Sequence, residues 1–387
     1  MFKNNLKITI RNLVKNKIYS LINIAGLAVG MVFAILILLW VQYEWSYDRF
    51  HENADRLYRV VFTTEQKEFH GYYQPGPLAA YLKENFPEIV QTTNFTDMQW
   101  KLSYETQGFF CIGSYVDPAF FEMFTFPLVK GNPKTVLTNP YSVVISKALA
   151  QKMFGQSDPI GKTLKLNDQT DLNITGVFKA VPKTSHLQFD FVISFEIAYD
   201  WMKMWDRKCV QTYILLQENC SLYKISQKIY GVMNKHNPTW KNVLYLYPIT
   251  KSHLYTLGGG GLITYVYIFS VLAILILIVA CINFMNLSTA RSEKRMKEIG
   301  IKKTVGSSRM ELVRQFLTET AAFSFLSLLL AVLLVELILP YINNILNMQI
   351  KMHYSGSMVI VLLGIALLTG LMAGSYPAFF LSSFEPV

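Results

Sequence analysis

Residues 268–287 read IFSVLAILILIVACINFMNL and contain no charged side chain. A helix rises about 1.5 Å per residue, so roughly 20 apolar residues cross the hydrocarbon core of a bilayer. The uncharged run extends beyond this core in both directions, from residue 262 to residue 290. This stretch therefore predicts a membrane-spanning helix.

Three further apolar runs are long enough to span a membrane, at residues 18–43, 315–340 and 358–377. The chain is 52% hydrophobic, which is high for a soluble protein. Four such runs argue against buried helices of a soluble core. Glu319 and Glu336 lie towards the two ends of the third run, where we expect each carboxylate to reach the membrane interface.

The first run follows a basic N-terminus, as a secretory signal would. Its apolar part is longer than the hydrophobic region of a signal peptide. The sequence that follows, QYEWSYD at residues 42–48, is not a small-residue cleavage site. We therefore interpret the first run as an uncleaved membrane anchor.

Basic residues predict the orientation of the chain. Residues 1–20 carry five basic residues and no acid, and residues 290–315 carry eight basic and three acidic residues. Together these segments account for the formal net charge of +10. By the positive-inside rule both are cytoplasmic, which places both termini inside and residues 48–258 outside the cell membrane. The excess of basic residues thus indicates how the chain is oriented in the membrane, and we expect no nucleic-acid partner.

The predicted fold class is an α-helical membrane protein with four transmembrane helices and a large α+β extracytoplasmic domain of two lobes. The expected parts, in chain order, are a cytoplasmic amphipathic helix (1–20), a first span (21–43), the extracytoplasmic domain (44–260), a second span (262–289), a cytoplasmic coupling loop or helix (290–312), a third span (313–340), a short external loop (341–356), a fourth span (357–379) and a cytoplasmic tail (380–387).

The large external segment mixes strand and helix patterns, which favours an α+β domain. Strands are predicted at residues 57–63, 142–145, 172–178, 211–216 and 243–247. Helices are predicted at residues 77–86, 146–154 and 221–233, with Ser221 as an N-cap. The run LGGGGL at residues 257–262 indicates a flexible hinge before the second span.

The stretch FGQSDPIGKTLKL at residues 154–166 resembles a phosphate-binding loop of the form GxxxxGK[ST]. Its gap between the glycines is five residues instead of four, and a strand-like alternation follows it instead of a helix. Its external position also separates it from ATP. We therefore expect a helix end, a turn and a strand.

No catalytic or metal-binding constellation stands out in the sequence. The histidines have neither HxxxH nor HExxH spacing. Asp48 with Glu52, or Asp168 with Asp171, could form acid/base pairs, but we expect solvated turn carboxylates. A strand between Cys209 and Cys220 would hold them beyond disulfide reach. Cys281 lies inside the second span, where we expect it to pack.

The cytoplasmic segment at residues 290–319 predicts an amphipathic helix. Met296, Ile299 and Val305 form an apolar edge among basic residues, and Gly306 breaks the helix. Ser308 and Glu311 then predict a capping box that begins the next helix. This composition suits either a helix on anionic lipid headgroups or a helix that docks into a protein groove.

These residues resemble a known family. EIGIKKTVGSS (298–308), with ARS before it and QFLTE after it, is similar to the coupling segment of MacB/FtsX-type ABC transporter permeases. Further similarity lies in residues 7–30, in residues 46–61, 114–133 and 143–167 of the external domain, and in residues 374–387. The resemblance thus places the loop at 154–166 in a MacB-like extracytoplasmic domain.

The resemblance implies that the coupling segment docks into a cytoplasmic ABC ATPase, which binds ATP and Mg and moves the external domain by mechanotransmission. No cofactor or metal is expected in this chain, which lacks an ATPase motif and is not itself expected to be an enzyme. The expected coupling residues are Arg295, Met296, Glu298, Ile299, Gly300, Ile301, Lys302, Val305 and Gly306.

Two pairs of glycines, Gly26 with Gly30 and Gly370 with Gly374, are expected to let helices approach closely. Long relatives continue into a second four-span half, so we expect a longer two-half permease or a homodimer. Other expected partners are the lipid bilayer of the inner membrane and a periplasmic adaptor.

The leading hypothesis is a permease that exports or extracts an amphipathic substrate. The alternative is an FtsX-like regulatory transmitter that activates a cell-wall hydrolase instead of transporting cargo. The large external domain favours the first.

Overall fold

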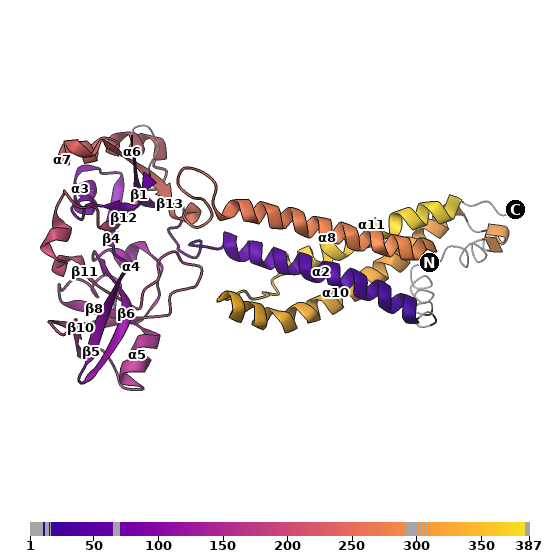
Figure 1. The fold of residues 1–387 in the computed structure, drawn as a ribbon, viewed down its shortest axis with the longest axis horizontal. Helices are drawn as coiled ribbons and strands as arrows, with labels where there is room; N and C mark the ends of the chain where they lie inside the picture. Colours follow the sequence, from indigo (N-terminus) through magenta and orange to yellow (C-terminus); the bar gives the residue numbers. More distant parts are fainter. Residues whose placement is uncertain are drawn as a thin grey trace. The chain divides into compact units, whose positions relative to one another are not determined.

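The computed structural model describes residues 17–64, 70–290, 300–301, 303–306 and 308–383, together with Arg11 and Lys15. The chain forms two compact units, Met1–Tyr43 with Thr264–Val387, and Glu44–Ile263 (Figure 1). We call the first the helical unit and the second the inserted unit, because it interrupts the sequence of the first.

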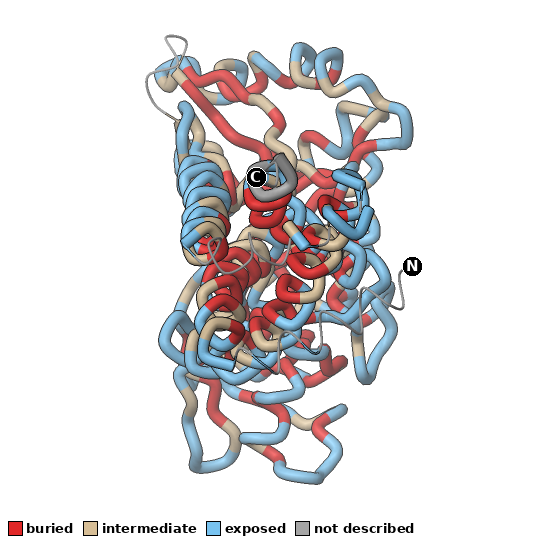
Figure 2. Tube along the Cα trace, turned by 90° about the vertical axis from the view of Figure 1, so that its right-hand side faces the viewer, coloured by how far each residue is buried: buried red, intermediate tan, exposed pale blue. Residues whose placement is uncertain are grey.

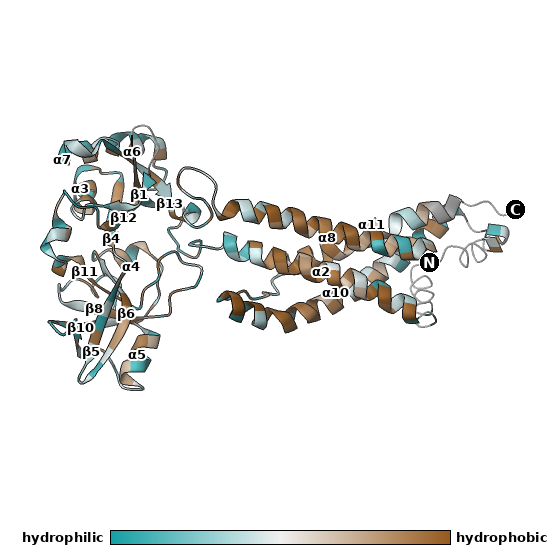
Figure 3. Ribbon diagram, viewed as in Figure 1, coloured by the Kyte–Doolittle hydropathy of each residue, from teal (hydrophilic) through white to brown (hydrophobic). Residues whose placement is uncertain are grey.

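Four long helices build the helical unit: α2 (Lys17–Trp45), α8 (Leu262–Ala290), α10 (Arg309–Leu346) and α11 (Gly356–Ser383). Each is long and apolar enough to cross a membrane. Hydrophobic residues run along all four (Figure 3). A helix satisfies its backbone N–H and C=O groups internally, which is why segments of this composition adopt it in lipid. Each of the four spans expected from the sequence lies within one of these helices.

Hydroxyl groups join α10 to two other helices. Ser327 Oγ donates a hydrogen bond of 3.1 Å to Ile24 O on α2. Ser324 Oγ donates one of 2.6 Å to Ala366 O on α11. Lipid tails are as apolar as leucine, so hydrogen bonds and close packing hold such helices together better than the hydrophobic effect does.

Glycines lie where α2 meets α8. A methyl group added at Gly30 would lie 2.6 Å from Ala280 Cβ, well inside van der Waals contact. At Gly26 the nearest atom would be Asn283 Nδ2 at 3.4 Å, an ordinary contact. The absence of a side chain is therefore required at Gly30 and merely compatible with the packing at Gly26.

A second pair of glycines lies where α11 meets α10. A Cβ at Gly370 would lie 3.1 Å from Ala321 Cα. A Cβ at Gly374 would overlap the hydroxyl of Thr320. The two positions are four residues apart, so they lie on one face of α11 and allow the backbones to approach over a full turn.

The two carboxylates of α10 lie in different environments. Glu336 is exposed and accepts a hydrogen bond of 2.7 Å from Tyr354 Oη. Glu319 is 5% exposed and so packs inside the helical unit, while its place relative to the membrane interface stays a prediction. Its spacing from Phe316 and Phe323 places it on the buried face of α10.

Thirteen strands form one hydrogen-bonded network in the described part of the inserted unit. The main path runs β11-β8-β10-β9-β5-β6-β4-β12-β1-β13, while β2, β3 and β7 pair with β1, β12 and β10. The pairs β8/β10 and β6/β11 are parallel, and the others are antiparallel. The sheet is therefore mixed.

The strands are β1 (Leu57–Thr64), β2 (His70–Gly71), β3 (Tyr73–Gln74), β4 (Ile89–Phe95), β5 (Met98–Tyr104), β6 (Gln107–Val116), β7 (Leu128–Lys130), β8 (Ser142–Ser146), β9 (Thr163–Leu166), β10 (Thr170–Phe178), β11 (Phe191–Ser194), β12 (Val210–Leu216) and β13 (Asn242–Pro248). The helices are α3 (Leu78–Asn85), α4 (Phe120–Met123), α5 (Lys147–Phe154), α6 (Leu222–Ile229) and α7 (Val232–His236).

All five predicted strands are confirmed, as β1, β8, β10, β12 and β13. The predicted N-cap is also confirmed, because Ser221 Oγ accepts a hydrogen bond from Lys224 N. The helix predicted over 221–233 is instead two helices, α6 and α7. The chain leaves α6 at Tyr230 and starts again after Gly231, which lacks a side chain and has weak helix propensity.

Among the described residues of the inserted unit, three hydrophobic clusters are present. Figure 2 shows the buried segments of the chain in red. One cluster is aromatic: the ring of Phe120 lies 5.3–6.2 Å, centroid to centroid, from those of Phe95, Phe124, Phe126 and Phe189. Such stacked, tilted and edge-on pairs add to the free energy gained by burial. Three clusters on one sheet do not define two lobes, so that division stays a prediction.

We expect Gly30→Ala to lower the free energy of unfolding by about 1–3 kcal/mol, because its methyl group would overpack against Ala280. Thermal or denaturant unfolding of the full chain in detergent measures the loss. Gly364→Ala on α11, where an added Cβ meets nothing within 4 Å, is the matched control. Adding Ala280→Gly to Gly30→Ala should restore stability. A loss that persists in this double variant would contradict the contact.

Candidate functional site

The segment between α8 and α10 carries the expected ATPase contact. Ile301 is helical and 66% exposed, and Val305 is 83% exposed. A methyl group at Gly300 would meet nothing within 4 Å. Val305, the described member of the predicted apolar edge, is therefore uncovered, and so is Ile301 four residues before it. Five of the expected coupling residues lie outside the described residues: Arg295, Met296, Glu298, Ile299 and Lys302.

The helix break at Gly306 and the start of α10 have the structure that the sequence predicts. Gly306 has a φ of +99°, a conformation that disfavours residues with a side chain. Ser308 Oγ accepts from Glu311 N at 3.3 Å, and Glu311 Oε2 accepts from Ser308 N at 3.1 Å, which confirms the capping box. The capped start of α10 therefore follows Val305 within a few residues, so little free chain separates the apolar edge from α10.

A contact between a buried carboxylate and a partly buried imidazole joins the two ends of the inserted unit. Glu44, in the last turn of α2, is 4% exposed and its Oε2 contacts His253 Nε2. The ring of Tyr47 stacks on His253 with a centroid distance of 3.3 Å. His253 lies ten residues before the end of the inserted unit at Ile263. We call Glu44, Tyr47 and His253 the stem clamp, because they hold together the entering and leaving segments.

Asp48 anchors the entering segment to the sheet. It is fully buried with a φ of +57°, and its N–H donates to Thr184 O at 2.9 Å. His186 N donates to Asp48 Oδ1 at 3.0 Å, and His186 Nδ1 lies 2.8 Å from Oδ2. His186 Nε2 lies 2.9 Å from Tyr213 Oη on β12. The contact therefore ties the chain that leaves α2 to a fully buried strand.

The expectation of solvated turn carboxylates was wrong for Asp48. Its burial depends on a partner 138 residues away, which local sequence does not reveal. The neighbouring Glu52 is exposed, as expected. Asp168 and Asp171 are also exposed and pair with lysines instead of with each other, so the expectation is confirmed for them.

His51 is a buried histidine held in its neutral form. Its Nδ1 accepts a hydrogen bond of 3.0 Å from Thr125 N, and only 3% of the residue is exposed. Burial lowers its pKa from 6.5 to about 4, although the nearby Asp48 charge opposes this shift. Below neutral pH an unfolded chain thus binds a proton here that the folded chain does not.

The glycine-rich stretch at 154–166 has the predicted structure. Helix α5 ends at Phe154, Gly155 and Gly161 have positive φ, and β9 begins at Thr163. Gly161 N donates to Ile174 O at 2.8 Å, so this amide is already engaged. The loop is a helix end, a turn and a strand edge.

In the parts of the chain that the structure describes, no group of three or more histidine, cysteine or acidic residues could hold a metal ion. The four cysteines are free thiols. Strand β12 runs between Cys209 and Cys220, as predicted. Cys281 is buried, with its Sγ 3.9 Å from Thr369 O on α11, and packs in the helical unit as expected.

The glycine run before α8 is a closed turn in the structure. Gly258, Gly259, Gly260 and Gly261 all have positive φ. Within the turn, Gly259 N donates to Thr256 O and Thr256 N donates to Gly260 O. These bonds shape the run, and hinge motion at this position stays a prediction.

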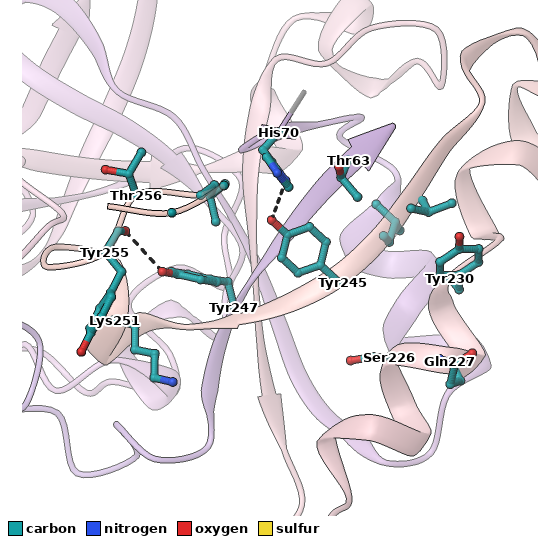
Figure 4. Close-up of a pocket in the computed structure, with 15 residues that line it drawn as sticks. Thr63, His70, Ser226, Gln227, Tyr230, Tyr245, Tyr247, Lys251, Tyr255 and Thr256 are labelled. Atoms are coloured by element: carbon teal, nitrogen blue, oxygen red, sulfur yellow. Dashed lines mark hydrogen bonds between the residues drawn. The ribbon is translucent and has the colours of Figure 1, made fainter. Parts of the chain in front are cut away.

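Beside this turn, a cavity of about 640 Å³ opens along β13 (Figure 4). Tyr245 Oη lies 3.0 Å from His70 Nδ1, and Tyr247 Oη donates to Tyr255 O at 3.3 Å. Burial raises the pKa of both tyrosines to about 12, so their hydroxyls stay protonated. The lining residues are Thr63, His70, Ser226, Gln227, Tyr230, Val243, Leu244, Tyr245, Tyr247, Lys251, Tyr255, Thr256, Leu257, Gly258 and Gly259.

The sequence reasoning missed this cavity. The strand 243–247 was predicted, and its YLY pattern places two tyrosines on one face. That alternation was the available signal. It does not reveal which turn covers that face.

The structure is that of a membrane protein with four long apolar helices and one large mixed domain inserted after the first. The MacB-like periplasmic core domain family matches residues 20–229. The FtsX-like permease C-terminal family matches residues 270–386. The chain therefore belongs to the MacB/FtsX family of ABC transporter permeases.

Two relatives carry the name macrolide export ATP-binding/permease protein MacB. That of Bdellovibrio bacteriovorus is 24% identical over 247 residues, which cover 63% of this chain and 38% of the relative. That of Pasteurella multocida is 24% identical over 288 residues, which cover 70% and 41%. The chain thus spans about two fifths of the length of these relatives. A crystal structure of a permease domain from Porphyromonas gingivalis matches with a TM-score of 0.46 and 22% identity, over 51% of this chain and 92% of that domain.

We expect acid to destabilise the inserted unit through His51. Its pKa is lower in the folded state, so its contribution to stability is present above pH 6.5 and is lost as the pH falls towards 4. The loss amounts to at most about 3 kcal/mol. His51→Asn keeps an acceptor for Thr125 N, and should show a smaller fall in melting temperature between pH 7 and pH 4.5. His353→Asn, in the helical unit, is the control, and equal acid sensitivity of wild type and His51→Asn would contradict the assignment.

We expect Glu44→Ala to increase local opening of both the entering and the leaving segment of the inserted unit, because it leaves His253 without its carboxylate partner. A partly buried imidazole left without its hydrogen-bond partner typically costs about 1–3 kcal/mol locally. Hydrogen exchange measured by mass spectrometry should accelerate in residues 44–51 and 252–263. Glu52→Ala, an exposed carboxylate eight residues along the chain, should leave exchange unchanged. Faster exchange in only one of these two segments would show that the stem clamp does not join them.

Proposed function

We propose that the chain is the permease subunit of an ABC transporter, and that it couples ATP hydrolysis by a partner ATPase to movement of its inserted unit. The movement would export or extract an amphipathic substrate by mechanotransmission. The observation that carries the proposal is the uncovered apolar surface of Ile301 and Val305, which lie shortly before the capped start of α10.

An apolar edge on a basic segment suits a protein groove with an acidic rim. The large exposed fractions of Ile301 and Val305 leave apolar surface that a partner can bury, at roughly 25 cal/mol per Å². The printed names of the relatives join an ATP-binding part to a permease part, which supports an ATPase as this partner. ATP and Mg would be bound by that ATPase.

Movement of the segment would pass first into α10. The capping box begins that helix, and Ser324 and Ser327 bond it to α11 and α2. Helix α2 continues into Glu44, where the stem clamp joins the entering and leaving segments of the inserted unit. The force would thus follow hydrogen-bonded helices and a paired junction instead of free linkers.

The basic segments at 1–20 and 290–315 support an inner-membrane location with both termini in the cytoplasm and the inserted unit in the periplasm. A second permease half or a second copy of this chain would complete the transporter. A periplasmic adaptor is a further proposed partner of the inserted unit.

We expect Ile301→Asp to lower recovery of the ATPase at least tenfold when the full chain is purified from its host in mild detergent. A buried carboxylate without a partner would oppose docking. Mass spectrometry of the eluate and its ATP hydrolysis provide the measurement.

Phe110→Asp is the matched control, since Phe110 is a 73% exposed apolar residue on β6 of the inserted unit. It should retain the ATPase. Recovery of no ATPase with the wild-type chain would overturn the proposal and favour a helix that lies on the lipid surface. Equal recovery of the ATPase with the wild-type chain and with Ile301→Asp would show that Ile301 is not part of the interface with the ATPase.

A further inference from the structure

The cavity beside β13 has the features of a built ligand site. Its volume of about 640 Å³ lies in the range typical of small-molecule pockets. Its walls come from separate parts of the inserted unit, which are β1 and β13, α6 and the glycine turn. In Figure 4 Tyr245 lies in the middle, with Tyr230 to one side and Tyr247, Tyr255 and Lys251 to the other. The pocket is therefore elongated along the strand.

Tyrosines provide most of the aromatic surface. Tyr245 and Tyr247 lie two residues apart on β13, so their rings project from the same face. Their hydroxyls are engaged with His70 and with Tyr255 O, which fixes the rings in place. Fixed rings present apolar faces to a ligand at little cost in conformational entropy.

The charge of the lining residues indicates which class of ligand the pocket would bind. Lys251 is the one lining residue with a fixed charge, and none of the described lining residues is acidic. Tyrosine rings alone would also suit a cation, but a lysine at the same site opposes one. The lining therefore favours an anion with an apolar body.

The edge of β13 is less suited to an added peptide strand. Leu244 N already donates to Tyr230 O at 3.1 Å, so an outward amide at the middle of the strand is occupied. A strand that paired along this edge would have to displace Tyr230. A small molecule has no such requirement.

We propose that this pocket binds an amphipathic organic anion, with its apolar body against Tyr245 and Tyr247 and its anionic group at Lys251. The ligand would be a client of the transporter, and in that respect the inference rests on the proposed function. Binding itself requires neither ATP nor the ATPase, so it can be measured separately.

Two probes that share one ring system test the proposal. They are 1-anilinonaphthalene-8-sulfonate, which is anionic, and N-phenyl-1-naphthylamine, which lacks the sulfonate. Each is titrated into the full chain in phosphatidylcholine nanodiscs, and the signal of empty nanodiscs is subtracted. We expect saturable binding of both probes, with the anionic probe binding more tightly and losing that advantage at high salt.

Variants place the binding in this pocket. Ser226→Trp fills the cavity from α6 and should abolish saturable binding of both probes. Lys251→Gln should weaken the anionic probe about two- to fivefold and leave the neutral probe unchanged, since exposed charge pairs are individually weak. Lys224→Gln, on the same helix as Ser226 but outside the lining, is the control and should change neither.

Each outcome decides a separate question. Unchanged probe binding in Ser226→Trp, with the ATPase still recovered, would show that the probes do not bind in this pocket and would leave the proposed function in place. Equal weakening of both probes by Lys251→Gln, or no weakening of the anionic probe, would overturn the anionic class. Probe binding that persists in Ile301→Asp, which should lack the ATPase, would show that the site is independent of the coupling segment.

Discussion

The contact between Glu44 and His253 is the constraint that holds together the two ends of the inserted unit. A large domain inserted into a membrane protein has an entering and a leaving segment, and each could be a free linker. Here a buried carboxylate, an imidazole and the stacked ring of Tyr47 hold the two segments together. The contact joins residues 209 positions apart. The entering and leaving segments are therefore held to each other.

Different interactions stabilise the inserted unit and the helical unit, because their surroundings differ. In the inserted unit, aromatic and aliphatic side chains leave water, and clusters such as that around Phe120 provide the driving force. In the helical unit, lipid removes that driving force, so contact relies on small residues and hydroxyls. Gly30 against Ala280 and Ser327 against Ile24 O are the two forms of such contact.

The stem clamp and the tyrosine-lined pocket share one short segment of chain. Lys251 and Tyr255 line the pocket, and His253 between them pairs with Glu44. A ligand that orders Lys251 and Tyr255 would therefore act on the residues that flank the clamp. Client binding and force transmission would meet at this segment without a separate relay.

Local patterns in the sequence were enough to determine the four apolar helices, five strands of the sheet, the Ser221 cap and the capping box of Ser308 and Glu311. Each depends on residues a few positions apart, where helical periodicity, strand alternation and capping chemistry act. Only the tertiary structure decided the burial of Asp48 and Glu319, the stem clamp and the pocket along β13. Their partners lie up to 209 residues away or on a neighbouring helix, and chain topology, which no local pattern encodes, brings them together.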